Sequence, residues 1–205
     1  GELKGVWLRP TETSEAEIIA TLNRLQQTGI DNVFIETYFH GKTIFPSKTM
    51  AAYGFTTQYE KFAGIDPLEI WIREAHKRGI KVHTWFETFY AGNQSPNDNP
   101  NSILAKNPSW GNKTKKDYAS TLPSKSTSEH NGYFLDPANP YVQDFITKLT
   151  EEIITRYKPD GINLDYIRYP NTVGTNEMSS WGYTEYARND FKNIFGVDPI
   201  DLVKS

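Results

Sequence analysis

The chain has 205 residues, a hydrophobic share of 37%, an aromatic share of 14% and a formal net charge of −3. This length favours one domain, residues 1–205, with a sizeable core, and no Lys/Arg run forms the basic stripe typical of nucleic-acid binding. The absence of cysteine excludes disulfides, thiolate metal sites and cysteine nucleophiles. No apolar run approaches the roughly 20 residues that cross a bilayer, so we expect no membrane span and no nucleic-acid partner.

Strand and helix patterns alternate along the chain. Four segments have the pattern of strands: residues 3–10 (LKGVWLRP), 32–39 (NVFIETYF), 81–90 (KVHTWFETFY) and 161–170 (GINLDYIRYP). Four segments have the pattern of helices: residues 15–28, 68–78, 141–157 and 183–195. Ser14 with Glu17 forms a capping box for the first helix, and Asp66 and Asn139, each followed by proline, cap the second and third. The alternation predicts a parallel sheet with right-handed crossovers.

The turn after the first strand distinguishes two ways of arranging such a sheet. An open dinucleotide-binding sheet needs a glycine-rich turn there, whereas this chain has RPTETS. We therefore expect an α/β fold of the (β/α) TIM-barrel type. A complete barrel has eight strand–helix units and typically about 250 residues, so these four units correspond to about its N-terminal half, truncated before the fifth strand. The polar stretches 41–64 and 92–131 are loops or hold further elements.

Half a barrel leaves two sheet edges without a neighbouring strand. The sequence is compatible with a fragment of a longer protein or with a small protein that pairs two half barrels. We expect self-association through these edges, or an element that covers them.

Charged residues recur near the end of each predicted strand. Side chains on a barrel strand alternate between the lumen and the helix layer. Those expected to face the helices are Val6, Leu8, Val33, Ile35, Val82, Thr84, Phe86, Ile162 and Leu164. The lumen then receives a rim of Arg9, Glu36, Glu87 and Asp165 above a floor of Trp7, Phe34, Trp85 and Asn163. Because barrel enzymes carry their active sites at the carboxyl ends of the strands, this rim is predicted to be functional.

Carboxylates at such a rim suit glycoside hydrolysis. Carboxyl groups about 5 Å apart are typical of retaining glycosidases, and groups about 6.5–9.5 Å apart of inverting ones. The acid needs a raised pKa and the nucleophile an ionised carboxylate, which Arg9 or Arg168 would help to secure. The competing interpretation is an ion-pair cluster around Arg9 that only stabilises the sheet.

Other site chemistries have weaker support. His83 has the lumen parity, but it lacks a second histidine two residues away and is interpreted as a satisfied core residue. Lys81 begins its strand and would lie at the wrong end of a barrel for a Schiff base. The stretch NQSPNDNP, residues 93–100, lacks the EF-hand pattern. We expect no metal ion and no cofactor.

Three motifs resemble the glycosyl hydrolase-like 10 family: KGVWLRP, FLDPANPYVQDFITKLTEEIITRY and PDGINLDYIRYP. The resemblance extends over the whole chain. It implies a glycosidase-type barrel in exported bacterial proteins, whether periplasmic, extracellular or lipid-anchored at the cell surface, some of them associated with the cleavage of cell-wall glycans. By analogy with related barrel glycosidases, Asp165 at the end of the fourth strand would be the nucleophile.

The rim and the resemblance together define the candidate site. The catalytic candidates are Asp165, Glu87 and Glu36. The residues expected to contact substrate are Arg9, Trp7, Tyr38, Trp85, Asp136, Tyr166 and Arg168. For Asp136, in FLDP, a role in the turn before the helix cap is an equal alternative.

Three functions remain open from the sequence. The first is a glycoside hydrolase acting on a bacterial polysaccharide, such as the glycan strands of peptidoglycan. The second is a non-catalytic carbohydrate-binding barrel fragment whose aromatic residues hold a glycan without cutting it. The third is an interaction domain whose sheet edges recruit another chain.

Overall fold

A computed structural model describes residues 4–127, 131–165, 184–196 and 198–201 of the chain. The chain divides into two compact units. The first, called the sheet unit, comprises Gly1–Thr88 and Lys148–Asp165, and the second, called the loop unit, comprises Phe89–Thr147 and Tyr166–Ser205. Among the described residues no helix is long and apolar enough to cross a membrane.

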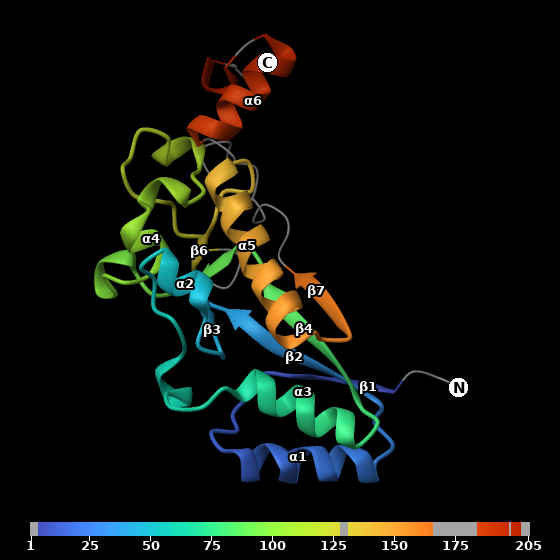
Figure 1. Ribbon diagram of the computed structural model, residues 1–205. Coiled ribbons are helices and arrows are strands. Elements are labelled where there is room, and N and C mark those ends of the chain that lie inside the picture. The colour runs from blue at the N-terminus through green and yellow to red at the C-terminus, as the bar shows by residue number, and fades with distance from the viewer. Residues whose placement is uncertain (1–3, 128–130, 166–183, 197, 202–205) are drawn as a thin grey trace. The chain divides into compact units, whose positions relative to one another are not determined.

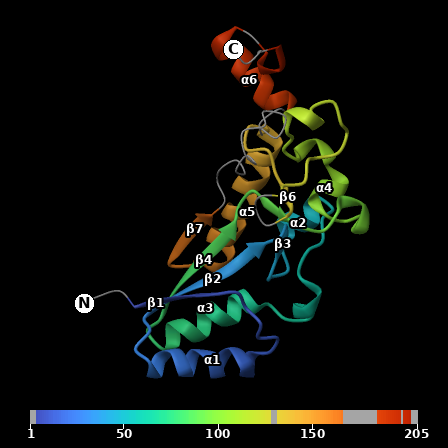
Figure 2. The same cartoon turned by 180° about the vertical axis from the view of Figure 1, so that it is seen from behind.

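The sheet unit is built on a parallel sheet whose strands follow one another in chain order. Its strands are β1 (Gly5–Leu8), β2 (Asn32–Phe39), β4 (Lys81–Glu87) and β7 (Gly161–Asp165), visible from both sides in Figures 1 and 2. A short strand, β3 (Lys42–Thr43), pairs antiparallel with β2. The order β1-β2-β4-β7 is that of consecutive strands in a (β/α) barrel, so the predicted α/β fold with four parallel strands is confirmed.

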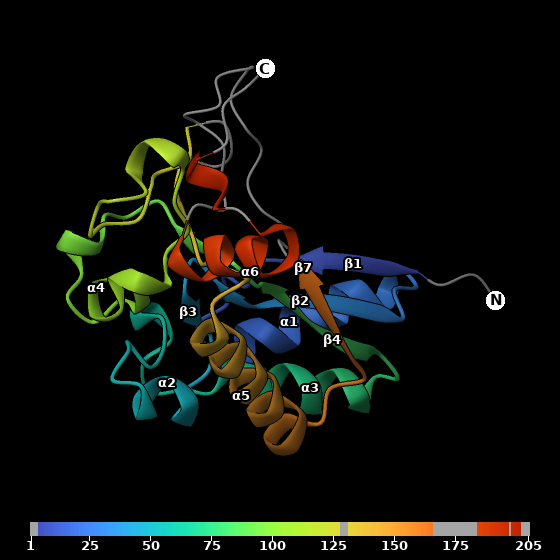
Figure 3. The ribbon, with the colours of Figure 1, turned by 90° about the horizontal axis from the view of Figure 1, so that it is seen from above.

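Helices connect these strands as the cap signals predict. The helices with residues in the sheet unit are α1 (Glu15–Gln27), α2 (Lys48–Ala52), α3 (Pro67–Lys77) and, from Lys148 onward, α5 (Pro140–Tyr157). Ser14 Oγ accepts a hydrogen bond from the Glu17 N–H, and Asp66 Oδ1 accepts one from the Glu69 N–H, each at 3.2 Å. Figures 1 and 3 show α1 and α3 side by side along one face of the sheet.

The core of the sheet unit lies between this helix layer and the strands. Five of the strand residues expected to face the helices are fully buried: Val33, Ile35, Val82, Thr84 and Phe86. Leu164 differs from the expectation, because 45% of its surface is exposed. It lies on β7, the last strand of the sheet order, where only β4 flanks the strand within this sheet.

The opposite face of the sheet carries a row of stacked rings. Strand register places Trp7, Phe34 and His83 side by side. The Trp7 and Phe34 ring centroids are 4.1 Å apart, and those of Phe34 and His83 are 4.5 Å apart. The predicted floor was therefore wrong in two members, Trp85 and Asn163. These two residues pair with each other, and Trp85 pairs with Glu36, one step nearer the rim. The relative stagger of neighbouring strands in a barrel-type sheet, which sequence parity ignores, accounts for the shift.

His83 is partly buried and has a hydrogen-bond partner, as predicted. Its Nε2 lies 2.7 Å from Asn32 Oδ1. On the neighbouring strand, a Cβ at Gly161 would lie 2.5 Å from His83 Nδ1. The first residue of β7 is therefore a glycine, because the His83 imidazole occupies the space that a side chain at position 161 would need.

The loop unit contains short elements that the sequence left within loops. They are β5 (Tyr90–Gly92), α4 (Ile103–Lys106) and β6 (Tyr133–Phe134), followed by the predicted last helix, α6 (Glu185–Phe195). Strands β5 and β6 pair antiparallel. The other polar stretch, residues 41–64, likewise holds β3 and α2 of the sheet unit.

Candidate functional site

Arg9 and Glu36 form the base of the rim. The guanidinium Nε lies 2.5 Å from Glu36 Oε2, and Nη2 lies 2.7 Å from Oε1, a bidentate pair. Glu36 is 1% exposed, whereas 48% of the Arg9 side chain is exposed. The hydrogen bond from Arg9 to Glu36 raises the pKa of the arginine, so this pair is a fixed ionic element of the rim.

Glu87 is the second buried carboxyl, and its surroundings favour the neutral acid. It is 3% exposed, and its Oε1 lies 3.5 Å from Arg9 Nη2 and 3.6 Å from His40 Nε2. No hydrogen bond reaches Oε1 from the described part of the chain. Burial, and then the charge of Glu36, raise the pKa of Glu87 to about 8 against the opposing effect of Arg9. Glu87 is therefore protonated near neutral pH.

Asp165 ends β7 directly beside Glu87. The two residues are partners in the parallel register of β4 and β7. Unlike Glu87, Asp165 is exposed, and Trp85 Nε1 donates to its Oδ2 at 3.3 Å. The rim therefore presents a buried neutral carboxyl and a solvent-accessible carboxyl on adjacent strands.

Aromatic surface adjoins these carboxyls. Trp7 is 50% exposed, and its ring meets that of Trp85 edge-on at a centroid distance of 5.0 Å. An exposed indole of this kind offers a flat apolar surface on which a sugar ring can stack. The role of both tryptophans in contacting substrate stays a prediction.

Tyr38 does not face the substrate side of the sheet, although the alternation along its strand predicted that it would. A register irregularity between Glu36 and Tyr38 puts Tyr38 opposite Phe86, with ring centroids 5.7 Å apart. Tyr38 is consequently fully buried and presents no surface to a substrate. The extra residue of a β-bulge reverses the facing of the residues beyond it, and the sequence carried no sign of that bulge.

Asp136 also lacks exposed surface. It belongs to the loop unit and is fully buried. Its Oδ1 accepts from the Ala138 N–H at 3.0 Å, and its Oδ2 accepts from the hydroxyl of Thr184, the N-cap of α6. Burial raises the pKa of Asp136. This is the turn arrangement that the sequence left open as the alternative.

Two residues near the rim were missed by sequence reasoning. His40 faces Glu87, and Tyr59 donates its hydroxyl to the Phe39 carbonyl at 2.6 Å. His40 had one signal, the His-Gly pair between two strand-like segments. Tyr59 had none. The remaining candidates, Tyr166 and Arg168, lie outside the described residues.

The chain is similar to known glycosyl hydrolases. Glycosyl hydrolase DigH of Escherichia coli (strain K12) is 32% identical over 170 residues, which cover 82% of this chain and 38% of that protein. Glycosyl hydrolase YngK of Bacillus subtilis (strain 168) is 27% identical over 213 residues, which cover 94% of this chain and 38% of that protein. The chain thus spans 38% of the length of these relatives.

A solved structure and a family model complete the comparison. The GH20 exo-β-N-acetylglucosaminidase from Vibrio harveyi, in complex with N-acetylglucosamine, has a TM-score of 0.62 at 15% identity. The match covers 97% of this chain and 31% of that chain, and it shows a shared glycosidase barrel-type fold. The family model described as Glycosyl hydrolase-like 10 matches residues 2–197. The chain therefore belongs to the glycosyl hydrolase-like 10 family, which supports a glycosidase-like function.

Proposed function

We propose that this chain carries the hydrolytic site of a glycoside hydrolase acting on a bacterial polysaccharide. Asp165 is the nucleophile and Glu87 the proton donor. The observation that supports this assignment most strongly is the pairing of a buried carboxyl of raised pKa with an exposed carboxyl on the adjacent strand. Two carboxyl groups whose environments differ in this way are suited to separate acid and nucleophile roles.

The chemistry follows from that pairing. Glu87 gives its proton to the glycosidic oxygen while an Asp165 oxygen attacks the anomeric carbon, and the leaving sugar departs with the proton. The Glu87 carboxylate then removes a proton from water, and the resulting hydroxide displaces Asp165. Adjacent strands lie about 4.8 Å apart, which favours the short carboxyl separation of retaining enzymes. We therefore expect the product to keep the anomeric configuration of the substrate.

The other rim residues support this reaction. The negative charge of Glu36 favours the protonated form of Glu87, and its bidentate bond fixes the guanidinium of Arg9. Glu36 is thus a positioning residue. Arg9, with half of its side chain exposed, contacts substrate hydroxyl groups, and Trp7 and Trp85 stack on sugar rings.

The first substrate to test is the peptide-free glycan strand of peptidoglycan, as the family resemblance suggests. The assay measures reducing ends released by the chain and by Asp165→Asn and Glu87→Gln variants. We expect release by the parent chain and loss in both variants. Glycan binding without release by the parent chain would instead favour the carbohydrate-binding alternative, and neither binding nor release would contradict the substrate proposal.

Export and self-association complete the proposal. We place the protein outside the cytoplasm of a bacterium, where cell-wall glycans are accessible, and cell fractionation tests this location. The outermost strands of the sheet, β1 and β7, supply the edges for self-association. Light scattering during size-exclusion chromatography should then give a mass above 23.5 kDa, and a mass equal to that value contradicts self-association.

A further inference from the structure

Two cations lie over a pair of stacked rings beside the rim, at the end of β2. The ring centroids of Phe39 and Tyr59 are 4.6 Å apart. The guanidinium carbon of Arg9 lies 4.6 Å from the Phe39 centroid, and Lys42 Nζ lies 5.5 Å from the Tyr59 centroid. The Tyr59 hydroxyl donates to the Phe39 carbonyl at 2.6 Å, and the Tyr59 N–H donates to the Thr43 carbonyl at 2.9 Å. These contacts fix both rings, and cation–π attraction holds the two cations over them.

Arg9 is held firmly but keeps donors for a ligand. A guanidinium has five N–H donors. Glu36 accepts one from Nε and one from Nη2, and Glu87 Oε1 lies 3.5 Å from the same Nη2. Within the described ranges no residue accepts a hydrogen bond from Arg9 Nη1, and 48% of the Arg9 side chain is exposed. The Nη1 end of this fixed guanidinium can therefore bind an acceptor from solution at little further cost in conformational entropy.

Two lysines add positive charge on this side of the rim. Lys61 Nζ donates to the carbonyl of Pro10, the residue after Arg9, at 3.4 Å. Neither Lys42 nor Lys61 forms an ion pair with a described residue. The negative charge of Asp165 lies on β7, at the other end of the strand order from β1, which is about 14 Å away at the usual strand spacing. The rim therefore has a cationic end, at β1 and β2, and an anionic end, at β7.

The charges at the cationic end favour an anion beside Glu87. Its three cations outnumber its two carboxylates, Glu36 and the exposed Glu60. Glu87 adds no negative charge near neutral pH, because burial and then Glu36 raise its pKa. Forked guanidinium donors bind a carboxylate more strongly and more selectively than a hydroxyl group. Since Arg9 Nη2 lies 3.5 Å from Glu87, such a carboxylate belongs to a sugar next to the bond that Glu87 protonates.

We propose that Arg9, with Lys42 and Lys61, makes the site specific for acidic glycans, through a carboxylate on a sugar that flanks the cleaved bond. This inference rests on the proposed function and adds to it the chemical class of the substrate. The peptide-free glycan of peptidoglycan belongs to this class, since every second sugar bears a carboxylate once its peptide is removed. A glycan whose carboxylates are blocked as amides should be a poor substrate. If the stacked rings and cations only stabilise the β2–β3 hairpin, the site does not distinguish the two forms.

The first test changes only the substrate. Peptide-free glycan strands are compared with the same strands after their carboxyl groups are converted into methyl amides. The loss of one charge-assisted hydrogen bond corresponds to a factor of roughly ten to a hundred. The kcat/KM of the parent chain should fall by about that factor for the amide, mainly through a rise in KM. Equal kcat/KM for the two glycans overturns the inference and leaves the hydrolase assignment intact.

The second test assigns the preference to the cationic end. Because Arg9 also contacts Glu36 and Glu87, its replacement can alter folding or kcat, but the ratio of kcat/KM for the two glycans within one variant cancels such changes. We expect a ratio near one in Arg9→Lys, which keeps the positive charge beside Glu36 but loses the forked donors. The ratio should fall about two- to fivefold in Lys42→Gln. An unchanged ratio in Arg9→Lys, or in Lys42→Gln where Arg9→Lys does not fold, overturns the inference. Lys81→Gln is the matched control, because Lys81 begins β4 at the opposite end of the strands, and it should keep the parent ratio.

Binding measured without cleavage separates this inference from the proposed function. Calorimetry with Glu87→Gln gives the Kd of both glycans, and the free acid should bind roughly ten- to hundredfold more tightly than the amide. If the parent chain cleaves neither glycan but this preference is found, the inference stands and the hydrolase assignment fails. If cleavage depends on Glu87 but both glycans bind equally, the inference alone fails. Binding of neither glycan contradicts both.

Discussion

Glu87 and Glu152 are both buried glutamates of the sheet unit, yet their surroundings act in opposite directions. Glu87 is 3% exposed and Glu152 is 8% exposed. Burial and the nearby Glu36 raise the pKa of Glu87. Burial alone would also raise the pKa of Glu152, but hydrogen bonds led by that from Ser47 outweigh it and lower the pKa. Burial itself therefore does not mark a catalytic carboxyl.

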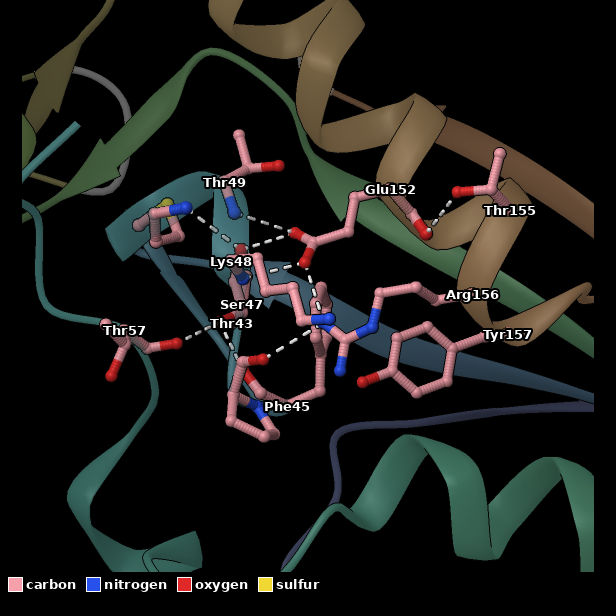
Figure 4. Close-up of polar contacts among 12 residues, drawn as sticks. Thr43, Phe45, Ser47, Lys48, Thr49, Thr57, Glu152, Thr155, Arg156 and Tyr157 are labelled. Carbon is pink, nitrogen blue, oxygen red and sulfur yellow. Dashed lines mark hydrogen bonds and ion pairs between the residues drawn. The ribbon is translucent and has the colours of Figure 1, made fainter. Parts of the chain in front are cut away.

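The difference lies in the number of hydrogen-bond donors. As Figure 4 shows, Glu152 on α5 accepts from donors at the start of α2 and from an arginine on its own helix. These donors are Ser47 Oγ at 2.6 Å, the Lys48 N–H at 2.7 Å, the Thr49 N–H at 3.2 Å and Arg156 Nη1 at 2.7 Å. A carboxylate so surrounded is held in its charged form. Glu152 links α5 to the start of α2, whereas Glu87 has the surroundings that the proposed proton donor needs.

The largest expected effect on catalysis is that of replacing Asp165, the exposed carboxyl of the rim. Asp165→Asn should lower kcat by at least about a thousandfold, because an amide cannot replace a carboxylate nucleophile. The unfolding temperature should stay within a few degrees of the parent value because Asp165 is exposed. Reducing-end release and thermal unfolding measure the two quantities, and surviving turnover would remove Asp165 from the nucleophile role.

Glu87→Gln should have the next largest effect on catalysis. Loss of the proton donor should lower kcat by roughly 10²–10³-fold, while folding is maintained because glutamine has nearly the shape of the neutral Glu87 carboxyl that it replaces. Glu152→Gln is the matched control, with an expected kcat within a factor of about two of the parent. An unchanged kcat in Glu87→Gln with reduced stability would instead support the ion-pair interpretation of the rim.

Glu152→Ala should show the opposite pattern, with its main effect a loss of stability and not a loss of kcat. The substitution leaves the buried Ser47 hydroxyl and the Arg156 guanidinium without their shared acceptor, which should cost about 2–3 kcal/mol of unfolding free energy. Chemical denaturation measures this loss, and Glu151→Ala is the control because Glu151 is an exposed residue of the same helix. Equal losses in both variants would mean that the contacts of Glu152 contribute nothing specific.

The two glutamates should also give opposite dependences of stability on pH. A pKa of about 8 for Glu87 in the folded chain, above the ordinary 4.5, adds stability below pH 4.5 that is lost as pH rises toward 8. The slope relative to Glu87→Gln is at most about 1.4 kcal/mol per pH unit. The lowered pKa of Glu152 adds stability above pH 4.5 that is lost on acidification. Denaturation of Glu87→Gln, Glu152→Gln and the parent chain across pH measures how the stability contribution of each glutamate changes with pH. Contributions that change in the same direction would contradict the contrast between the two glutamates.

The smallest expected effect concerns the indole that bonds to Asp165. Trp85→Phe keeps an aromatic ring but removes the N–H that lies 3.3 Å from Asp165 Oδ2. Losing one hydrogen bond to a charged group near the surface should lower kcat by about three- to tenfold. Steady-state kinetics measure the change, and a rise in KM alone would show that Trp85 acts only in substrate binding.

The sequence predicted the elements of the sheet unit well because local signals define them. Ser14 and Asp66 cap their helices as the motifs indicate, and the four predicted strands align in parallel in chain order. The alternation of side chains along each strand also correctly predicted that Arg9, Glu36 and Glu87 lie close together. Such features depend on a few neighbouring residues or on a regular period of two.

Features that depend on contacts between strands were not predictable. The irregularity beside Tyr38 and the stagger that places His83 in the stacked row arise from strand pairing, which single-strand patterns do not record. The proximity of His40 to Glu87 depends on the pairing of β2 with both β3 and β4. The contrast between Glu87 and Glu152 likewise depends on donors that are distant along the chain, such as Ser47.

The most direct test of the account is the pH dependence of kcat/KM for glycan cleavage. Because Glu87 is the proposed proton donor, kcat/KM of the parent chain should decline as pH rises above about 8. In Glu87→Gln the residual activity should lack this decline. A decline that is unchanged in Glu87→Gln would contradict the account and assign the proton donor to another group.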